Sequence, residues 1–208
     1  ISALGKEGCA LFIDCRTLDA TPASLPVGTS VLILDTMTRR GLVESAYNER
    51  RAQCKAAAGH FGVGVLRDIS VAQFEARSGE LDPLSRKRAR HVVYENQRTR
   101  DALAAMQAND ASTLGRLMDE SHASLRDDFE VTNDALNTMV TIVRRQSGCF
   151  GARMTGAGFG GCAVALVASD RADAIADIVR SAYQASTGLK PALYVSTPSE
   201  GTSRIDLP

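Results

Sequence analysis

Residues 151–168 read GARMTGAGFGGCAVALVA, and this stretch decides the fold. Its first part, GARMTG at 151–156, is expected to be extended, and CAVALVA at 162–168 is an apolar run of strand length. The intervening GAGFGG at 156–161 holds four glycines in six positions, which excludes regular secondary structure there. The stretch therefore predicts two neighbouring strands joined by a glycine-rich loop.

The flanking segments extend these two strands into a sheet. Downstream, a helix with Asp170 as its N-cap and Gly188 as its stop precedes a strand at 192–198 (ALYVSTP). Upstream, the β-branched, apolar run SVLILDT at 30–36 predicts a buried strand. Helices separate this strand from 151–156. The order is therefore β-α-β-β-α-β, the ferredoxin-like arrangement of an α+β fold, with extra helices in its first crossover.

The extra helices are predicted from apolar spacing and from capping residues. A first helix is expected from Leu42 to Ala58, and a second over 84–108. The candidate N-caps of two further helices are Asp110 or Ser112, and Thr132 or Asn133. Within the second helix, the basic run RKRAR at 86–90 is interpreted as a solvated face, because acidic residues lie on both sides of it.

The first 28 residues read as a separate unit. CALFIDCR at 9–16 predicts a strand, whereas TLDATPASLPVG at 17–28 has the Pro, Thr and Ser content of a connection. We therefore expect residues 1–28 to belong to an upstream domain and 29–208 to form the domain with the sheet. Because the chain begins with Ile1 rather than Met, we expect it to be the C-terminal part of a longer protein. The strand at 9–16 would then expose an edge that pairs with another copy.

Composition narrows the class of function. The chain has 208 residues with 24 Lys and Arg against 24 Asp and Glu, and a net charge of zero argues against binding to nucleic acid. No apolar run approaches the roughly 18 residues of a membrane span, so no membrane partner is expected. Five cysteines without a C-x-x-C pair, together with three histidines, argue against a zinc site. Scattered cysteines and the lack of a signal-peptide pattern predict a cytoplasmic protein.

The strongest candidate site is the glycine loop, which consists of Gly156, Ala157, Gly158, Phe159, Gly160 and Gly161. It contains G-x-G-x-x-G, but a dinucleotide-binding loop opens a helix, whereas a strand follows here. A Walker-type loop is excluded because no Lys-Ser/Thr pair follows. The N–H groups of a glycine-rich loop can still bind an anion, and its backbone can approach a ligand closely. The alternative is a hairpin turn against which another backbone packs.

Two further segments carry polar groups. In SAYNERR, Tyr47 lies near a helix start, where its phenol can reach a ligand hydroxyl; the alternative is a charged, solvated helix face. In SHASLRDDFE, Ser121 and His122 lie near acidic residues, but no nucleophile elbow or oxyanion loop accompanies them. We therefore interpret His122 as structural. Adjacent Asp127 and Asp128 do not share a helix face, which argues against a metal site.

These segments also carry a family resemblance. GARMTGAGFGGCAVAL resembles the third motif of the GHMP small-molecule kinases. The segments that resemble the galactokinase family in particular are SAYNERRAQC, RARHVVYENQRTRDA, DESHASLRDDFEVT, the opening ISALGKEGCALFIDCRTL and the closing YVSTPSEG. The resemblance covers essentially the whole chain. The departures are Cys9, where His is common, Ala46, where Glu is common, and residues 201–204.

The resemblance implies ATP-dependent transfer of the γ-phosphoryl group to the 1-hydroxyl of galactose, with Mg²⁺. It implies a fold of two lobes with the active site between them, of which residues 29–208 would be the C-terminal lobe. Tyr47 matches the tyrosine that contacts galactose, and Gly156 to Gly161 match the loop near the phosphate and the sugar. The family's catalytic Asp, its sugar-binding segment and its main phosphate loop have no counterpart in these 208 residues. The resemblance therefore implies that this chain holds neither a catalytic residue nor a metal ligand. It implies an N-terminal lobe as the partner of this chain, and it implies that the chain alone is inactive.

Two other functions remain open from the sequence. Some galactokinase-like proteins sense galactose and ATP and bind a regulator instead of turning over substrate. Another GHMP kinase could act on a related sugar such as N-acetylgalactosamine. The residues that would distinguish these functions lie largely outside the chain.

Overall fold

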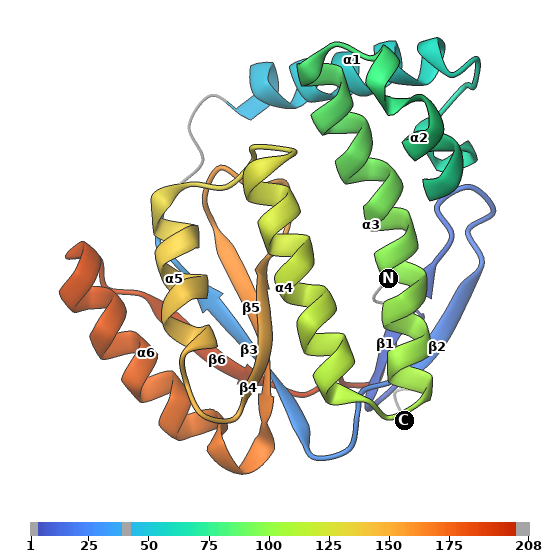
Figure 1. The fold of residues 1–208 in the computed structure, drawn as a ribbon. Helices are drawn as coiled ribbons and strands as arrows, with labels where there is room; N and C mark the ends of the chain where they lie inside the picture. Colours follow the sequence, from blue (N-terminus) through green and yellow to red (C-terminus); the bar gives the residue numbers. More distant parts are fainter. Residues whose placement is uncertain (1–3, 39–42, 203–208) are drawn as a thin grey trace, which may run out of the picture.

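A computed structural model describes residues 4–38 and 43–202 of the chain (Figure 1). Its strands and helices are, in chain order, β1 (Cys9–Ile13), β2 (Ala20–Ser24), β3 (Thr29–Asp35), α1 (Val43–His60), α2 (Val71–Arg77), α3 (Pro83–Gln107), α4 (Ala111–Asp127), α5 (Asp134–Arg144), β4 (Cys149–Met154), β5 (Cys162–Ala168), α6 (Ala172–Thr187) and β6 (Ala192–Ser196). Leu42, the expected first residue of the first helix, lies outside the described residues, as do Ser203 and Arg204. Among the described residues, no helix combines the length and the apolar character needed to cross a bilayer.

Four strands form an antiparallel sheet in the order β4-β5-β3-β6. The two apolar runs of the sequence, β5 and β3, occupy its centre and pair along their whole length, with Leu32 opposite Ala165 and Asp35 opposite Cys162. Strand β6 pairs with the other edge of β3, and β4 pairs with β5 across the glycine loop. This order confirms the predicted ferredoxin-like arrangement, with helices α1 to α5 in the first crossover.

The main core lies between one face of the sheet and the helices α5 and α6, which cover it side by side (Figure 1). Alternate residues of β3, including Leu32 and Leu34, point into this core and are fully buried. Tyr183 of α6 is also buried, and its hydroxyl donates to the carbonyl of Thr36 at 3.0 Å. That bond fixes the end of β3 next to the glycine loop, because the hydroxyl of Thr36 in turn donates to the Gly161 carbonyl at 2.6 Å.

Helix α4 packs directly against strand β4, and glycine makes this contact possible. A Cβ added to Gly115 of α4 would lie 2.1 Å from the carbonyl oxygen of Phe150, and one on Gly151 would lie 1.9 Å from the carbonyl oxygen of Gly115. Asp119, one turn further along α4, accepts from the N–H of Ala152 at 2.9 Å. Helix and strand therefore meet backbone to backbone, which residues with side chains at 115 and 151 would prevent.

A second hydrophobic cluster joins α1, α2 and α3 around the fully buried Phe74. The segment between the first two predicted helices thus contains structure that the sequence reading left unassigned. Its helix α2 begins with a capping box, in which Ser70 accepts from Gln73 N–H and the Gln73 side chain accepts from Ser70 N–H. Helix α3 begins with Asp82 as its N-cap and Pro83 in the first turn, two residues that favour a helix start.

The N-terminal region differs from the prediction. Residues 17–28 were expected to form a connection, but they contain β2, which pairs with β1 in an antiparallel hairpin beside α3 (Figure 1). The predicted strand at 9–16 therefore has a partner within the chain. Asp14 binds Arg67 through two hydrogen bonds of 2.7 and 2.8 Å. Because an ion pair and strand pairing both hold this segment, the hairpin is part of the folded chain rather than a loose start.

The boundaries of α6 confirm one prediction and correct another. Gly188 ends the helix in the left-handed conformation with a φ of 73°, as a C-terminal glycine does. Asp170, however, is not its N-cap. A short 3-10 turn over Ser169–Arg171 precedes α6. The N-cap of α6 is Arg171, whose side chain makes no capping hydrogen bond.

Candidate functional site

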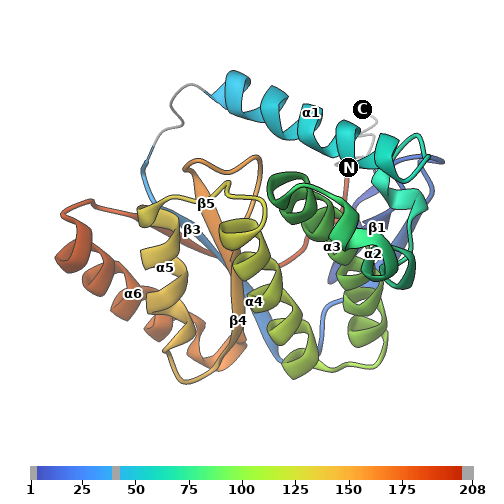
Figure 2. The same ribbon diagram turned by 45° about the horizontal axis from the view of Figure 1, so that its top comes forward.

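Two segments that the sequence singled out separately line one cavity. This cavity of about 270 Å³, called the Tyr47 cavity below, lies between α1 and the glycine loop. Its lining residues are Tyr47, Arg50, Arg51, Cys54, Leu125, Phe129, Val131, Gly156, Ala157 and Phe159. Tyr47 is 58% exposed, so its phenol is available to a ligand. In Figure 2, α1 runs above the ends of β3 and β5 and continues above α3.

The glycine loop has a conformation that requires its glycines. Positive φ angles occur at Gly156, Gly158, Gly160 and Gly161, and also at Phe159 with a φ of 59°. The C-terminal end of the loop is held to the segment after β3, because Gly161 donates to the Thr38 carbonyl at 3.0 Å and accepts from Thr36 N–H at 3.1 Å. The loop thus has successive positive φ angles, a geometry that can form a backbone-lined concavity.

Gly158 packs against another backbone, which was one of the two interpretations of the loop. A Cβ at this position would lie 2.1 Å from the carbonyl oxygen of Val131, and the next N–H, of Phe159, donates to that oxygen at 2.7 Å. Within the described residues, the N–H groups of Ala157, Gly158 and Gly160 have no acceptor. The loop therefore combines tight backbone packing with free donors that suit an anion.

The segment 128–131 connects α1 to the glycine loop. Arg50 of α1 donates to the carbonyls of Phe129 at 2.7 Å and Glu130 at 3.2 Å. Val131, the next residue, contacts the loop through Gly158 and Phe159. Because one short segment touches both sides of the Tyr47 cavity, Arg50 helps to set the distance between the phenol and the loop.

Arg88 corrects the expectation that RKRAR is a solvated face. Its side chain is only 2% exposed, and its guanidinium donates to the side chain of Gln53, the carbonyl of Asp128 and the carboxylate of Glu130. Helix α3 therefore also holds the segment 128–131. The contact joins residues 40 or more positions apart, so neither periodicity nor local charge pattern could have found it.

The polar residues of the block around His122 form no hydrolase site. His122 is buried, and its Nδ1 atom accepts from the N–H of Met154 at 3.2 Å, which agrees with a structural role. Asp127 pairs with its neighbour Arg126 instead. Ser124 is bonded to a different histidine, His91, at 3.0 Å in the interior. The His91 ring stacks on Phe129, behind the wall of the Tyr47 cavity, and does not itself line the cavity.

Both buried histidines make stability depend on pH. Burial lowers the pKa of His91 from 6.5 to about 3 and that of His122 to about 4. The unfolded chain therefore binds protons below pH 6.5 that the folded chain does not bind until about pH 4. Stability is expected to fall as pH decreases through this window, by up to about 1.4 kcal/mol per pH unit for each histidine.

Urea unfolding at pH 6.5 and at pH 5 measures this slope while most carboxylates remain ionised. The variant His91→Gln keeps a group that can bond to Ser124 but cannot be protonated, so its slope is expected to be shallower. An unchanged slope in His91→Gln would show that His91 does not contribute to the pH dependence.

The chain is similar to a known family of proteins over the region that contains the glycine loop. The sequence model of the family described as "GHMP kinases C terminal" matches residues 102–185. This region is thus similar to the C-terminal domain of the GHMP kinases. It comprises the end of α3, all of α4 and α5, strands β4 and β5, and most of α6, and it includes the glycine loop between the two strands.

Relatives extend the similarity beyond the GHMP kinase C-terminal domain itself. The chain is 50% identical over 205 residues to galactokinase of Haemophilus influenzae strain PittEE, and 49% identical to galactokinase of strain Rd of the same species. Each alignment covers 97% of this chain but 53% of the relative. The chain therefore spans about half the length of the curated relatives that it matches.

Solved structures agree with this assignment. The chain superposes on galactokinase of Lactococcus lactis, solved in complex with galactose, with a TM-score of 0.90 and 38% identity over 97% of this chain and 54% of that one. Mevalonate kinase of L. major, in complex with R-mevalonate, has a TM-score of 0.56 at 19% identity, over 94% of this chain and 50% of that one. The second similarity supports the fold alone.

Proposed function

We propose that the protein containing this chain is a galactokinase, which transfers the γ-phosphoryl group of ATP to the 1-hydroxyl of galactose. The observation that carries this proposal is the Tyr47 cavity, where Tyr47 meets the glycine loop in a chain about 50% identical to galactokinases. In this proposal the chain supplies one wall of the active site, and the other half of the protein supplies the opposite wall.

The residues of the Tyr47 cavity suit binding and orientation. The phenol of Tyr47 can hydrogen-bond a sugar hydroxyl, and Leu125, Phe129 and Val131 offer an apolar surface to the sugar. The free N–H groups of the glycine loop can bind phosphate oxygens. Phosphoryl transfer depends mainly on such positioning and on stabilisation of charge.

Mg²⁺ does not fit the Tyr47 cavity by itself. Mg²⁺ prefers carboxylate and other oxygen ligands, and no carboxylate is among the lining residues that the structure describes. We therefore place the metal ligands and the catalytic base in the other half of the protein. We also propose a cytoplasmic location, because the reaction consumes ATP and the five cysteines form no disulfide in the structure.

³¹P NMR of galactose 1-phosphate formation tests the proposal. The whole protein, supplied with Mg-ATP and galactose, is expected to form this product, and residues 1–208 alone are expected to form none. Loss of a general base alone lowers a rate about 10²–10⁴-fold. Product from residues 1–208 alone would overturn the proposed division of roles. No product from the whole protein would favour a galactose sensor, and product only from N-acetylgalactosamine would favour a related sugar kinase.

Tyr47→Phe in the whole protein tests the role of the phenol. Loss of one hydrogen bond to the sugar is expected to raise the KM for galactose about tenfold, while the KM for ATP changes little. Tyr94→Phe is the matched control, because the Tyr94 hydroxyl bonds to Glu75 away from the Tyr47 cavity. Equal KM values in the two variants would exclude a contact between Tyr47 and galactose.

A further inference from the structure

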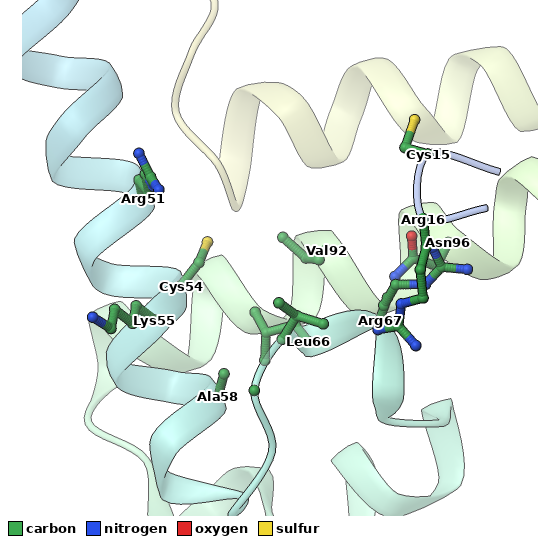
Figure 3. A pocket seen from close by; sticks show the side chains of 12 residues that line it. Cys15, Arg16, Arg51, Cys54, Lys55, Ala58, Leu66, Arg67, Val92 and Asn96 are labelled. Carbon is green, nitrogen blue, oxygen red and sulfur yellow. The ribbon is translucent and has the colours of Figure 1, made fainter. Parts of the chain in front are cut away.

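A second, larger cavity lies further along the same face of α1, next to the Tyr47 cavity. It has a volume of about 610 Å³, within the range of small-molecule sites. We call it the basic cavity, and its lining residues are Cys15, Arg16, Arg51, Cys54, Lys55, Ala58, Gly64, Val65, Leu66, Arg67, Val92 and Asn96. These residues come from the β1–β2 turn, α1, the segment 64–67 and α3, as Figure 3 shows.

The charges around the basic cavity do not balance. Among the described residues, four cationic side chains line it and no carboxylate does. Arg16 pairs with Asp68 at 2.8 Å, and Arg67 pairs with Asp14 at 2.7 Å, so two of the four charges are neutralised from outside the lining. Arg51 and Lys55, on successive turns of α1, have no ion-pair partner within the described part of the chain. The cavity therefore carries an excess of positive charge at its rim.

The interior of the basic cavity is apolar apart from one amide. The side chains of Ala58 and Leu66 are buried, and Val92 lies beside them (Figure 3). Asn96 lies near Arg16 and Arg67 at one end of the cavity, and its buried Nδ2 atom has no hydrogen-bond partner. A buried donor without an acceptor is unfavourable, so this amide provides a recognition point for an acceptor atom.

We propose that the basic cavity binds a small organic anion with an apolar body, such as an aryl or alkyl phosphate or carboxylate. Its apolar part would contact Leu66 and Val92, its charge would lie near Arg51 and Lys55, and an acceptor atom would bond Asn96. Neither Tyr47 nor any residue of the glycine loop lines this cavity. Arg51 and Cys54 line both cavities. The proposal does not rest on the proposed kinase reaction, and binding can be measured without turnover.

Titration calorimetry with phenyl phosphate tests the proposal, with inorganic phosphate and phenol as comparisons. The titrations use the whole protein and, in parallel, residues 1–208. Phenyl phosphate is expected to bind at least tenfold more tightly than either comparison, because only it combines a charge with an apolar body. Equal affinity for inorganic phosphate would indicate a surface charge effect and overturn the proposal. Binding to residues 1–208 but not to the whole protein would show that another part of the protein fills the cavity, which would also overturn it.

Variants locate the binding site. Arg51→Gln combined with Lys55→Gln removes both unpaired cations and is expected to weaken phenyl phosphate binding at least tenfold. Asn96→Leu removes the unpaired donor at similar volume and is expected to weaken it at least threefold. The matched control combines Arg100→Gln with Lys190→Gln, because both are exposed cations that line neither cavity. An equal loss in the control would overturn the assignment to this cavity.

Discussion

Gly158→Ala is expected to destabilise the chain by about 3–5 kcal/mol and to displace the glycine loop. The added Cβ would lie 2.1 Å from the carbonyl oxygen of Val131, and because that oxygen belongs to the backbone it cannot move away as a flexible side chain could. The φ of 84° adds about 1–2 kcal/mol for a residue with a side chain. Urea unfolding measures the loss of stability, and galactose affinity of the whole protein measures the displacement of the loop.

Gly79→Ala is the matched control for this substitution. No atom lies within 4 Å of a Cβ at that position, and its φ is not in the left-handed region. Its free energy of unfolding is expected to change by less than about 1 kcal/mol. If Gly158→Ala unfolds at the same urea concentration as Gly79→Ala, then the loop does not pack against Val131 as described.

The contacts of the glycine loop show which features of the site the sequence predicts and which it does not. Four glycines between two apolar strands predict both the turn and a close approach by another group, and the structure contains both. The identity of that group, Val131, depends on where the α4–α5 connection lies in the folded chain. Such long-range contacts leave no local pattern. The sequence could therefore indicate that something packs on the loop but not which residue does.

In the fold as well, some features follow from local sequence patterns and others depend on long-range contacts. The order of the sheet follows from the order of apolar runs, because a ferredoxin-like arrangement is a common solution for that order of elements. Strand β2, ATPAS, was missed because proline and small polar residues are typical of connections. It becomes a strand because β1 provides a partner for it. Tertiary context, rather than propensity, decides both this hairpin and the burial of Arg88.

Arg88→Met is expected to lower stability by about 2–4 kcal/mol and to weaken galactose binding. Methionine fills much of the volume but donates no hydrogen bond. The side chain of Gln53, the carbonyl of Asp128 and the carboxylate of Glu130 would each lose a donor. Glu130 has a φ of 55°, a conformation that needs support from its surroundings. Without Arg88, the segment that carries Val131 is expected to shift, and the Tyr47 cavity would lose its shape.

Arg90→Met separates this effect from a loss of charge on α3. Arg90 lies two residues away and half exposed, and its only ion pair in the described part of the chain is with Asp128 at 3.8 Å. Because an exposed pair at this distance contributes little, Arg90→Met is expected to change stability by less than about 1 kcal/mol and to leave galactose affinity unchanged. Urea unfolding and galactose titration of the whole protein compare the two variants. If Arg88→Met loses stability but keeps full galactose affinity, then α3 supports the fold without positioning the wall of the Tyr47 cavity.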